Sequence, residues 1–432
     1  MEWLGKIPAH WDVKRLLYSC SLNPTKSELN GLSKDTEVSF LPMESIDENG
    51  DLILDKTRVI EEVYQGYTYF RDGDVIVAKI TPCFENGKGA MCRNLLGSIG
   101  FGTTELHVLR PNKQTTSKFI FYLTKSQTFR VLGEAMMQGT AGQKRVPEDF
   151  IRNFTTALPP TPEQYAIADF LDHEAAKIDA LVAKKERLIK LLQEKRTALI
   201  THAVARGLDP DVPMKDSGVE WLGEIPAHWN IIHLKYAASY IIDCPHSTPI
   251  YSSDGDYHVI RTADVSPGCL NLSNTLRVNI SEYLKRIDRL KPEAGDIVYS
   301  REGERYGMAA IVPEESMVCL GQRMMHFRTN SAFNPSFLMW QLNSDSTYRQ
   351  AQQDTTGATS PHVNVDTIRN FWLTEPPLTE QIVIATYINC ETSKIDSLIT
   401  KIRQHIEKLR EYRTALISAA VTGKIDVREE MA

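Results

Sequence analysis

The chain spells the same ten-residue phrase twice, as EWLGKIPAHW at residues 2–11 and as EWLGEIPAHW at residues 220–229. Nine of the ten positions agree, 218 residues apart. A second pair of copies lies downstream, where IRNFTTALPPTPEQ at 151–164 answers IRNFWLTEPPLTEQ at 368–381. Self-similarity at a fixed long period indicates a structural repeat. The 432-residue chain, which is too long for one ordinary core, is therefore predicted to be a tandem duplication.

A long helix is predicted at the end of each copy. KIDALVAKKERLIKLLQEKRTALI at 177–200 and KIDSLITKIRQHIEKLREYRTALI at 394–417 agree at 13 of 24 positions. A threonine, a proline and, three residues on, a glutamine form an N-terminal helix signal at 161–164. No Pro or Gly then follows before Gly207, and none lies between Pro377 and Gly423. We expect helices over 158–206 and 375–423.

Apolar residues recur in heptad fashion along both predicted helices, which is typical of a coiled coil. The two seams are imperfect in complementary places, because Lys185 of the first answers Ile402 of the second. This favours packing of the two helices against each other within one chain. The alternative is that each helix packs only on its own globular domain. The predicted seam consists of Ile178, Leu181, Leu188, Leu192, Leu199, Ile395, Leu398, Ile402, Leu409 and Leu416.

The segments ahead of the helices, 1–157 and 220–374, have a different character. Short β-rich runs such as DVIVAKI (74–80) and MMHFRT (324–329) alternate with turn residues and short helical stretches. We expect two mixed α/β domains with mainly antiparallel or barrel-like sheets, joined through a linker at 207–219, and a C-terminal tail at 424–432. RDGDVIVAK (71–79) answers EAGDIVYSR (293–301), so the two domains share a frame.

Four motifs now stand twice in the chain: EWLGxIPxHW, DGD or AGD followed by an apolar run, PPxxEQ, and KID…RTALI. With them the whole chain resembles the specificity subunit of type I restriction–modification enzymes. The resemblance implies two target-recognition domains, each reading one half of a bipartite DNA site. It also implies a pseudo-two-fold molecule in which the long helices form an antiparallel coiled coil, set the spacing and dock two methyltransferase subunits.

The resemblance implies further partners and cofactors. Double-stranded DNA is the expected ligand, and two restriction subunits are the expected partners where the system cleaves DNA as well as methylating it. S-adenosylmethionine, ATP and Mg are expected on partner subunits and none of them on this chain. No membrane partner is expected, and the seven scattered cysteines predict a cytoplasmic protein without disulfides.

Base recognition needs hydrogen-bonding side chains on loops that enter the major groove, such as Arg or Lys for guanine and Gln or Asn for adenine. In the first domain the loops 79–91 and 139–146 combine glycines with such residues; in the second, the loops 300–308, 321–325 and 357–362 do so. The candidate DNA-binding residues are Lys79, Asn86, Lys88, Gln143, Lys144, Arg145, Ser300, Arg301, Arg305, Tyr306, Gln322, Arg323, Ser360 and His362.

Charge weighs against strong DNA binding by this chain alone. Residues 1–155 carry 19 basic and 19 acidic residues, and residues 216–372 carry 13 basic and 18 acidic ones. Counterion release can therefore supply little affinity. We expect partner subunits to make most of the phosphate contacts.

No catalytic motif stands out in the sequence. It contains no GxxxxGK[ST], no HExxH and no Asn-Pro-Pro-aromatic element of an adenine methyltransferase. We expect a non-catalytic subunit. Two alternatives remain open: a coiled-coil scaffold that joins two protein partners without binding DNA, and the recognition part of a restriction enzyme that acts by a different scheme.

Overall fold

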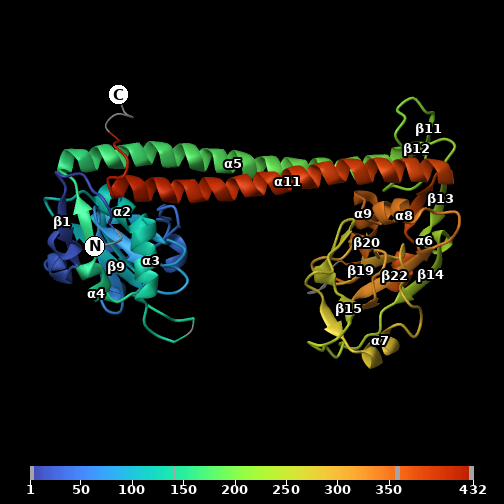
Figure 1. The fold of residues 1–432 in the computed structure, drawn as a ribbon, viewed down its shortest axis with the longest axis horizontal. Coiled ribbons are helices and arrows are strands. Elements are labelled where there is room, and N and C mark those ends of the chain that lie inside the picture. The colour runs from blue at the N-terminus through green and yellow to red at the C-terminus, as the bar shows by residue number, and fades with distance from the viewer. Residues whose placement is uncertain (1–3, 141, 356–360, 428–432) are drawn as a thin grey trace. The chain divides into compact units, whose positions relative to one another are not determined.

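The structure is a computed structural model that describes residues 4–140, 142–355 and 361–427. It divides into two compact units. Unit 1 combines Met1–Lys185 with Arg403–Ala432, and unit 2 is Glu186–Ile402. Each unit is a globular α/β domain packed on a stretch of two long helices (Figure 1). Unit 1 therefore combines residues from the first part of the chain with residues from its last part.

The long helices are α5 (Thr161–Arg206) and α11 (Leu378–Val421), of 46 and 44 residues. They begin after the PP steps, where the carbonyls of Pro160 and Pro377 accept hydrogen bonds from the first turn. They end at Gly207 and Gly423, whose positive φ angles of 76° and 70° suit glycine at a helix C-terminus. Each helix passes from one unit into the other.

Inward positions on both helices alternate in steps of three and four residues, which is the a/d pattern of a coiled coil. In α5 they include Ile178, Leu192 and Leu199 from the predicted seam. In α11 they include four more predicted seam residues, Ile395, Ile402, Leu409 and Leu416. These seven side chains are buried or half-buried.

Three leucines of the predicted seam are instead exposed: Leu181 by 42%, Leu188 by 43% and Leu398 by 45%. The inward positions lie one residue further along each helix, and there the side chains are β-branched. They are Val182, Ile189 and Ile399, of which Ile399 is 6% exposed. One residue turns a helix by about 100°, so the choice between adjacent apolar residues decides which side chain enters the seam.

The described residues of unit 1 form two four-stranded sheets and a β-pair. Their orders are β2-β9-β6-β7, β4-β3-β8-β5 and β1-β10. All the pairings are antiparallel except that of β3 with β8. The strands are β1 (Asp12–Arg15), β2 (Cys20–Leu22), β3 (Glu37–Leu41), β4 (Thr57–Val59), β5 (Thr68–Arg71), β6 (Val75–Ala78), β7 (Gly89–Met91), β8 (Ile99–Gly102), β9 (Leu106–Pro111) and β10 (Thr155–Leu158). The short helices are α1 (Ile60–Val63), α2 (Ser117–Lys125), α3 (Gln127–Ala135) and α4 (Glu148–Asn153).

In its described residues, unit 2 repeats the main sheet as β14-β22-β19-β20, beside a three-stranded sheet β18-β15-β21 and three β-pairs. Its strands are β11 (Met214–Asp216), β12 (Glu224–Pro226), β13 (Asn230–His233), β14 (Ala238–Asp243), β15 (Tyr257–Ile260), β16 (Val265–Ser266), β17 (Cys269–Leu270), β18 (Leu276–Val278), β19 (Ile297–Ser300), β20 (Ala309–Ile311), β21 (Val318–Leu320), β22 (Met324–Thr329) and β23 (Trp372–Glu375). Its short helices are α6 (Leu234–Ala237), α7 (Ile280–Arg286), α8 (Pro335–Leu342), α9 (Asp345–Asp354) and α10 (Val365–Arg369). The predicted class, mixed α/β domains with mainly antiparallel sheets, is confirmed.

The repeated phrase EWLGxIPxHW docks each domain on the start of its helix. In unit 1 the indole N–H of Trp11 donates to Glu163 at 3.1 Å. In unit 2 the indole N–H of Trp229 donates to Glu380, also at 3.1 Å. The preceding histidine donates to the same carboxylate in both units. The phrase is repeated because both helices need this anchor.

The glutamine of each PPxxEQ step is fully buried and links helix to domain. The amide of Gln164 accepts from the N–H of Thr116 and donates to the carbonyls of Gln114 and Pro159. Gln381 makes the same three kinds of hydrogen bond in unit 2. A buried amide with all these partners tolerates few replacements, because an unpaired polar group in a core is costly.

Candidate nucleic-acid interface

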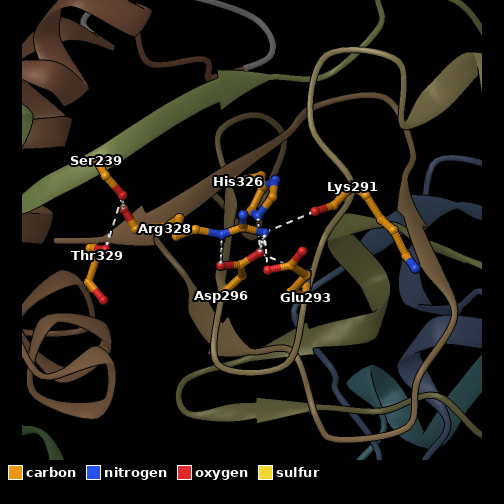
Figure 2. Close-up of polar contacts among 7 residues, drawn as sticks. All are labelled: Ser239, Lys291, Glu293, Asp296, His326, Arg328 and Thr329. Carbon is orange, nitrogen blue, oxygen red and sulfur yellow. Dashed lines mark hydrogen bonds and ion pairs between the residues drawn. The ribbon is translucent and has the colours of Figure 1, made fainter. Parts of the chain in front are cut away.

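A buried carboxylate holds the strands from which the candidate loops extend. Asp296, which directly precedes β19, accepts from Nε and Nη2 of Arg328 at 2.8 Å and from Nε2 of His326 at 2.7 Å (Figure 2). Arg328 also donates to the carbonyl of Lys291 at 3.0 Å. Burial alone would raise the pKa of Asp296, but these hydrogen bonds and one from the N–H of Glu293 outweigh it and lower the pKa to about 2.

Unit 1 contains the same arrangement at Asp74, which accepts from Nε and Nη2 of Arg110 at 2.7 Å. Val108 stands where unit 2 has His326, since β6 pairs with β9 as β19 pairs with β22. The aspartate of the DGD or AGD motif, which the two domains share, therefore links neighbouring strands of the main sheet in both units. It leaves the loops at the far ends of these strands free to differ.

In unit 1 the two predicted loops lie side by side. The N–H of Val146 donates to the carbonyl of Lys79 at 2.8 Å, and the N–H of Thr81 donates to the carbonyl of Lys144 at 3.0 Å. A third segment joins them, because the N–H of Lys79 donates to the carbonyl of Glu105 at 2.9 Å. Loops far apart in sequence thus form one cluster, which we call loop cluster 1: residues 79–88, 103–105 and 138–146 without residue 141.

The six candidate side chains of unit 1 differ in their contacts. Arg145 is exposed and forms a bidentate ion pair with Glu105, at 2.8 and 2.9 Å. Hydrogen bonds from Arg145 hold the pKa of Glu105 below its usual value. Lys88 is half-buried and donates to a backbone carbonyl, that of Met43. Lys79 is also half-buried, whereas Asn86, Gln143 and Lys144 are exposed.

Unit 2 builds the equivalent cluster from equivalent backbone contacts. The N–H of Arg301 donates to the carbonyl of Arg323 at 2.9 Å, and the N–H of Val363 donates to the carbonyl of Arg301 at 3.1 Å. Glu302 and His362 form a β-bridge. Loop cluster 2 therefore comprises residues 301–307, 321–323 and 361–363. Ser360, also a candidate, lies outside the described residues.

Three candidates in unit 2 are buried, and they hold the domain together rather than face outward. Ser300 is fully buried because it ends β19. The guanidinium of Arg301 is held by Glu302 at 2.7 Å. Tyr306 is 8% exposed and stacks on Tyr348 with ring centroids 5.2 Å apart. The expectation that these side chains reach into DNA is therefore corrected.

The remaining candidates of unit 2 lie at the surface of loop cluster 2. Arg305, Arg323 and His362 are exposed, and Gln322 is half-buried. Arg323 lies 3.6 Å from Glu302, and Gln322 donates to the hydroxyl of Thr248 at 3.0 Å.

Sequence reasoning missed Glu105 and Glu302, the acidic partners of these loops. A search for hydrogen-bond donors passes over carboxylates, although Glu105 and Glu302 orient the arginines. Glu302 directly follows Arg301 in sequence, which was the available signal.

Within residues 4–140, 142–355 and 361–427, no three His, Cys, Asp or Glu side chains gather as a metal site would require. In the same residues no helix is long and apolar enough to cross a membrane.

Comparison with known proteins agrees with this architecture. Residues 25–191 and 244–408 match the family described as the type I restriction modification DNA specificity domain. The match occurs twice, once over each domain and most of the helix that follows it. The chain belongs to this family.

Individual relatives point the same way. The EcoEI specificity subunit of Escherichia coli is 40% identical over 164 residues, which are 38% of this chain and 27% of that protein. The EcoAI specificity subunit is 39% identical over the same shares. The matched part thus spans about a quarter of the length of these two relatives. The MjaVIII specificity subunit of Methanocaldococcus jannaschii is 22% identical over 77% of this chain and 76% of its own.

Two solved structures share the fold. A chain from a type I R-M system, studied for its complex assembly and conformational transition, superposes with a TM-score of 0.75 at 17% identity. The superposition covers 97% of this chain and 100% of the other. The HsdS subunit of Thermoanaerobacter tengcongensis gives a TM-score of 0.56 at 17% identity over 97% and 98% of the two chains.

Proposed function

We propose that this chain is the DNA-recognition subunit of a type I restriction–modification system, with each domain reading one half of a bipartite site. The observation that carries the proposal is the pair of loop clusters. Both extend from the same strand frame and are joined by the same backbone hydrogen bonds. Glu105 and Arg145 of cluster 1 correspond to Arg323 and His362 of cluster 2. One scaffold with two different sets of donors and acceptors suits two different sequences.

The long helices would hold the two readers at a set distance on the duplex. A helix is a semi-rigid spacer, whereas a flexible linker would let the gap between half-sites vary. The outer faces of the two long helices would also bind protein partners. In unit 2, Leu188 and Leu191 of α5 are 43% and 51% exposed, one turn apart on the same side of the helix. Apolar side chains that protrude together favour a protein partner, and we assign this role to two methyltransferase subunits.

In this proposal the chain is not catalytic. S-adenosylmethionine would bind to the methyltransferase subunits, and ATP and Mg to restriction subunits where these are part of the system. The domains contribute hydrogen bonds to base edges, while partner subunits contribute most of the charge that binds phosphates. The near-neutral first domain and the acidic second domain support this division.

The experiment is co-expression with a methyltransferase subunit of the same system, followed by methylation mapping of the host DNA. The proposal expects one bipartite motif with a fixed non-specific gap. A scaffold that does not bind DNA, the alternative, would leave methylation without any such motif. Deleting residues 230–372 should then remove the requirement for one half of the motif without altering the other half.

A further inference from the structure

Arg145 in loop cluster 1 is held by three hydrogen bonds although its side chain is exposed. Its Nε and Nη2 donate to the two carboxylate oxygens of Glu105, at 2.8 and 2.9 Å. Its Nη1 donates to the carbonyl of Gln143 at 3.3 Å. A guanidinium has five N–H groups in one plane. Three are therefore occupied, and one N–H remains on each of Nη1 and Nη2.

The side chain that carries these two remaining N–H groups is 45% exposed. The backbone beneath them is fixed, since Arg145 pairs with Gln138 through two hydrogen bonds of 2.8 and 3.0 Å and also bridges Ile80. The guanidinium is thus oriented before any ligand arrives. Pre-orientation reduces the side-chain entropy that is lost on binding.

Two candidate ligands accept hydrogen bonds from such an edge: a phosphate and the O6 and N7 atoms of guanine. Glu105 decides between them. Its negative charge cancels that of Arg145, which removes most of the long-range attraction to a phosphate. Directional hydrogen bonds to a base edge survive this cancellation. Adenine offers an acceptor beside a donor, and thymine offers one acceptor, so guanine fits two parallel donors best.

We propose that Arg145, positioned by Glu105, reads a guanine in the half-site of the first domain. This inference rests on the proposed DNA-recognition function and names the base that the function leaves open. Lys144, the exposed neighbour, has no carboxylate partner among the ion pairs of the described residues and is suited to a phosphate. The two adjacent cations would thus have different tasks.

Loop cluster 2 does not repeat this reader. Arg323 occupies the place of Glu105, and its nearest carboxylate, Glu302, lies 3.6 Å away and is shared with Arg301. His362 occupies the place of Arg145. The guanine requirement that we assign to Arg145 should therefore belong to one half-site only.

The test uses the full chain in complex with its methyltransferase subunits and a pool of duplexes with randomised sequence. Bound duplexes are sequenced for the wild-type chain and for Arg145→Ala, Glu105→Gln and Lys144→Ala. We expect the wild-type complex to prefer guanine by roughly 10-fold or more at one position of the site. In Arg145→Ala this preference should be lost, while the preferences at all other positions of the DNA stay unchanged. Glu105→Gln should weaken the same preference, and Lys144→Ala should lower affinity evenly for all sequences.

A chemical control uses a duplex with 7-deazaguanine at the selected position, which removes the N7 acceptor. The wild-type complex should lose affinity on this duplex, and the Arg145→Ala complex should lose none beyond its own deficit. Unchanged base preferences in Arg145→Ala, or an even loss for all sequences, would overturn the inference and leave the proposed function standing. If the wild-type complex selects no sequence at all, the proposed function fails and the inference with it.

Discussion

Arg413 of α11 lies with its Nε 3.1 Å from Oδ1 of Asp179 on α5. Unit 2 contains the equivalent ion pair, but here the arginine lies on α5 and the aspartate on α11. Arg196 of α5 lies 3.0 Å from Asp396 of α11. The two arginines are 217 residues apart in the sequence, and so are the two aspartates. A duplicated helix that pairs with its copy in antiparallel fashion must make each cross-helix contact twice. These two ion pairs are such a repeated contact between the two helices.

Reversing the charge of one partner should destabilise unit 1, and reversing both should restore it. Arg413→Asp and Asp179→Arg each place like charges at the seam, whereas the double variant recreates an ion pair with opposite polarity. Asp179 is 44% exposed, so we expect a coupling energy of only about 0.5–1 kcal/mol. Urea unfolding of the four chains measures it. Lys394→Ala, which removes an exposed pair within α11, serves as the control and should change little.

The anchor between Trp229 and Glu380 should matter more, since the tryptophan side chain is fully buried. Glu380→Ala leaves the indole N–H without its acceptor and should lower the free energy of unfolding by about 1–2 kcal/mol. Glu380→Gln retains an acceptor oxygen and should cost less than half as much. Thermal or urea unfolding distinguishes them. Equal losses in the two variants would show that the charge matters and the hydrogen bond does not. Glu220→Ala, at an exposed position of the same phrase, is the matched control.

Asp296 should make unit 2 sensitive to acid. Folding lowers its pKa from 3.8 to about 2, because hydrogen bonds from Arg328, His326 and the Glu293 N–H outweigh the opposing effect of burial. A carboxylate with a depressed pKa stabilises the folded state fully above its unfolded pKa and loses that contribution as pH falls through the folded value. We expect about 2 kcal/mol to disappear between pH 4 and pH 2. The stability difference between wild type and Asp296→Asn, measured in urea at several pH values, should shrink over this window.

The duplication and the long helices were predictable because they depend on local and repeated signals. The helices were expected at 158–206 and 375–423 and lie at Thr161–Arg206 and Leu378–Val421. It was harder to predict which single residues point into the seam between the helices. Adjacent apolar residues such as Leu188 and Ile189 allow two heptad phases, and only the packed partner selects one.

The loop clusters were predictable as loops but not as side-chain arrangements. Composition could not show that Arg301 would turn inward to Glu302, or that Tyr306 would stack on Tyr348. Tyr306 and Tyr348 come from a loop and a helix, and Arg301, although adjacent to Glu302, is oriented by backbone hydrogen bonds to Arg323 and Val363. Pairing between strands that are distant in sequence places them, and a single sequence carries no direct record of such pairs.

Burial distinguishes two arginines of loop cluster 2, one suited to contact DNA and one that stabilises the domain. Arg323 is 54% exposed, so Arg323→Ala should alter base preference in one half-site with little change in stability. Arg301 is 9% exposed and lies between Glu302 and Asp243. Arg301→Ala removes a buried cation from between two carboxylates and should lower stability by roughly 1–3 kcal/mol. Methylation mapping and urea unfolding of both variants test this division. A stable Arg301→Ala chain with a changed half-site would contradict it.

The last prediction concerns the helices as spacers between the half-sites. Four residues inserted after Ala183 in α5 and four after Thr400 in α11 lengthen both helices near the junction of the two units. They add about 6 Å of helix and rotate the following residues by about 40°. The inward positions can then re-form their contacts. Since DNA rises about 3.4 Å per base pair, the gap should grow by one or two base pairs while both half-sites keep their sequence. A two-residue insertion turns the seam by about 200° and should instead abolish methylation. Methylation mapping reads out each variant, and an unchanged gap in the four-residue variant would show that partner subunits set the distance.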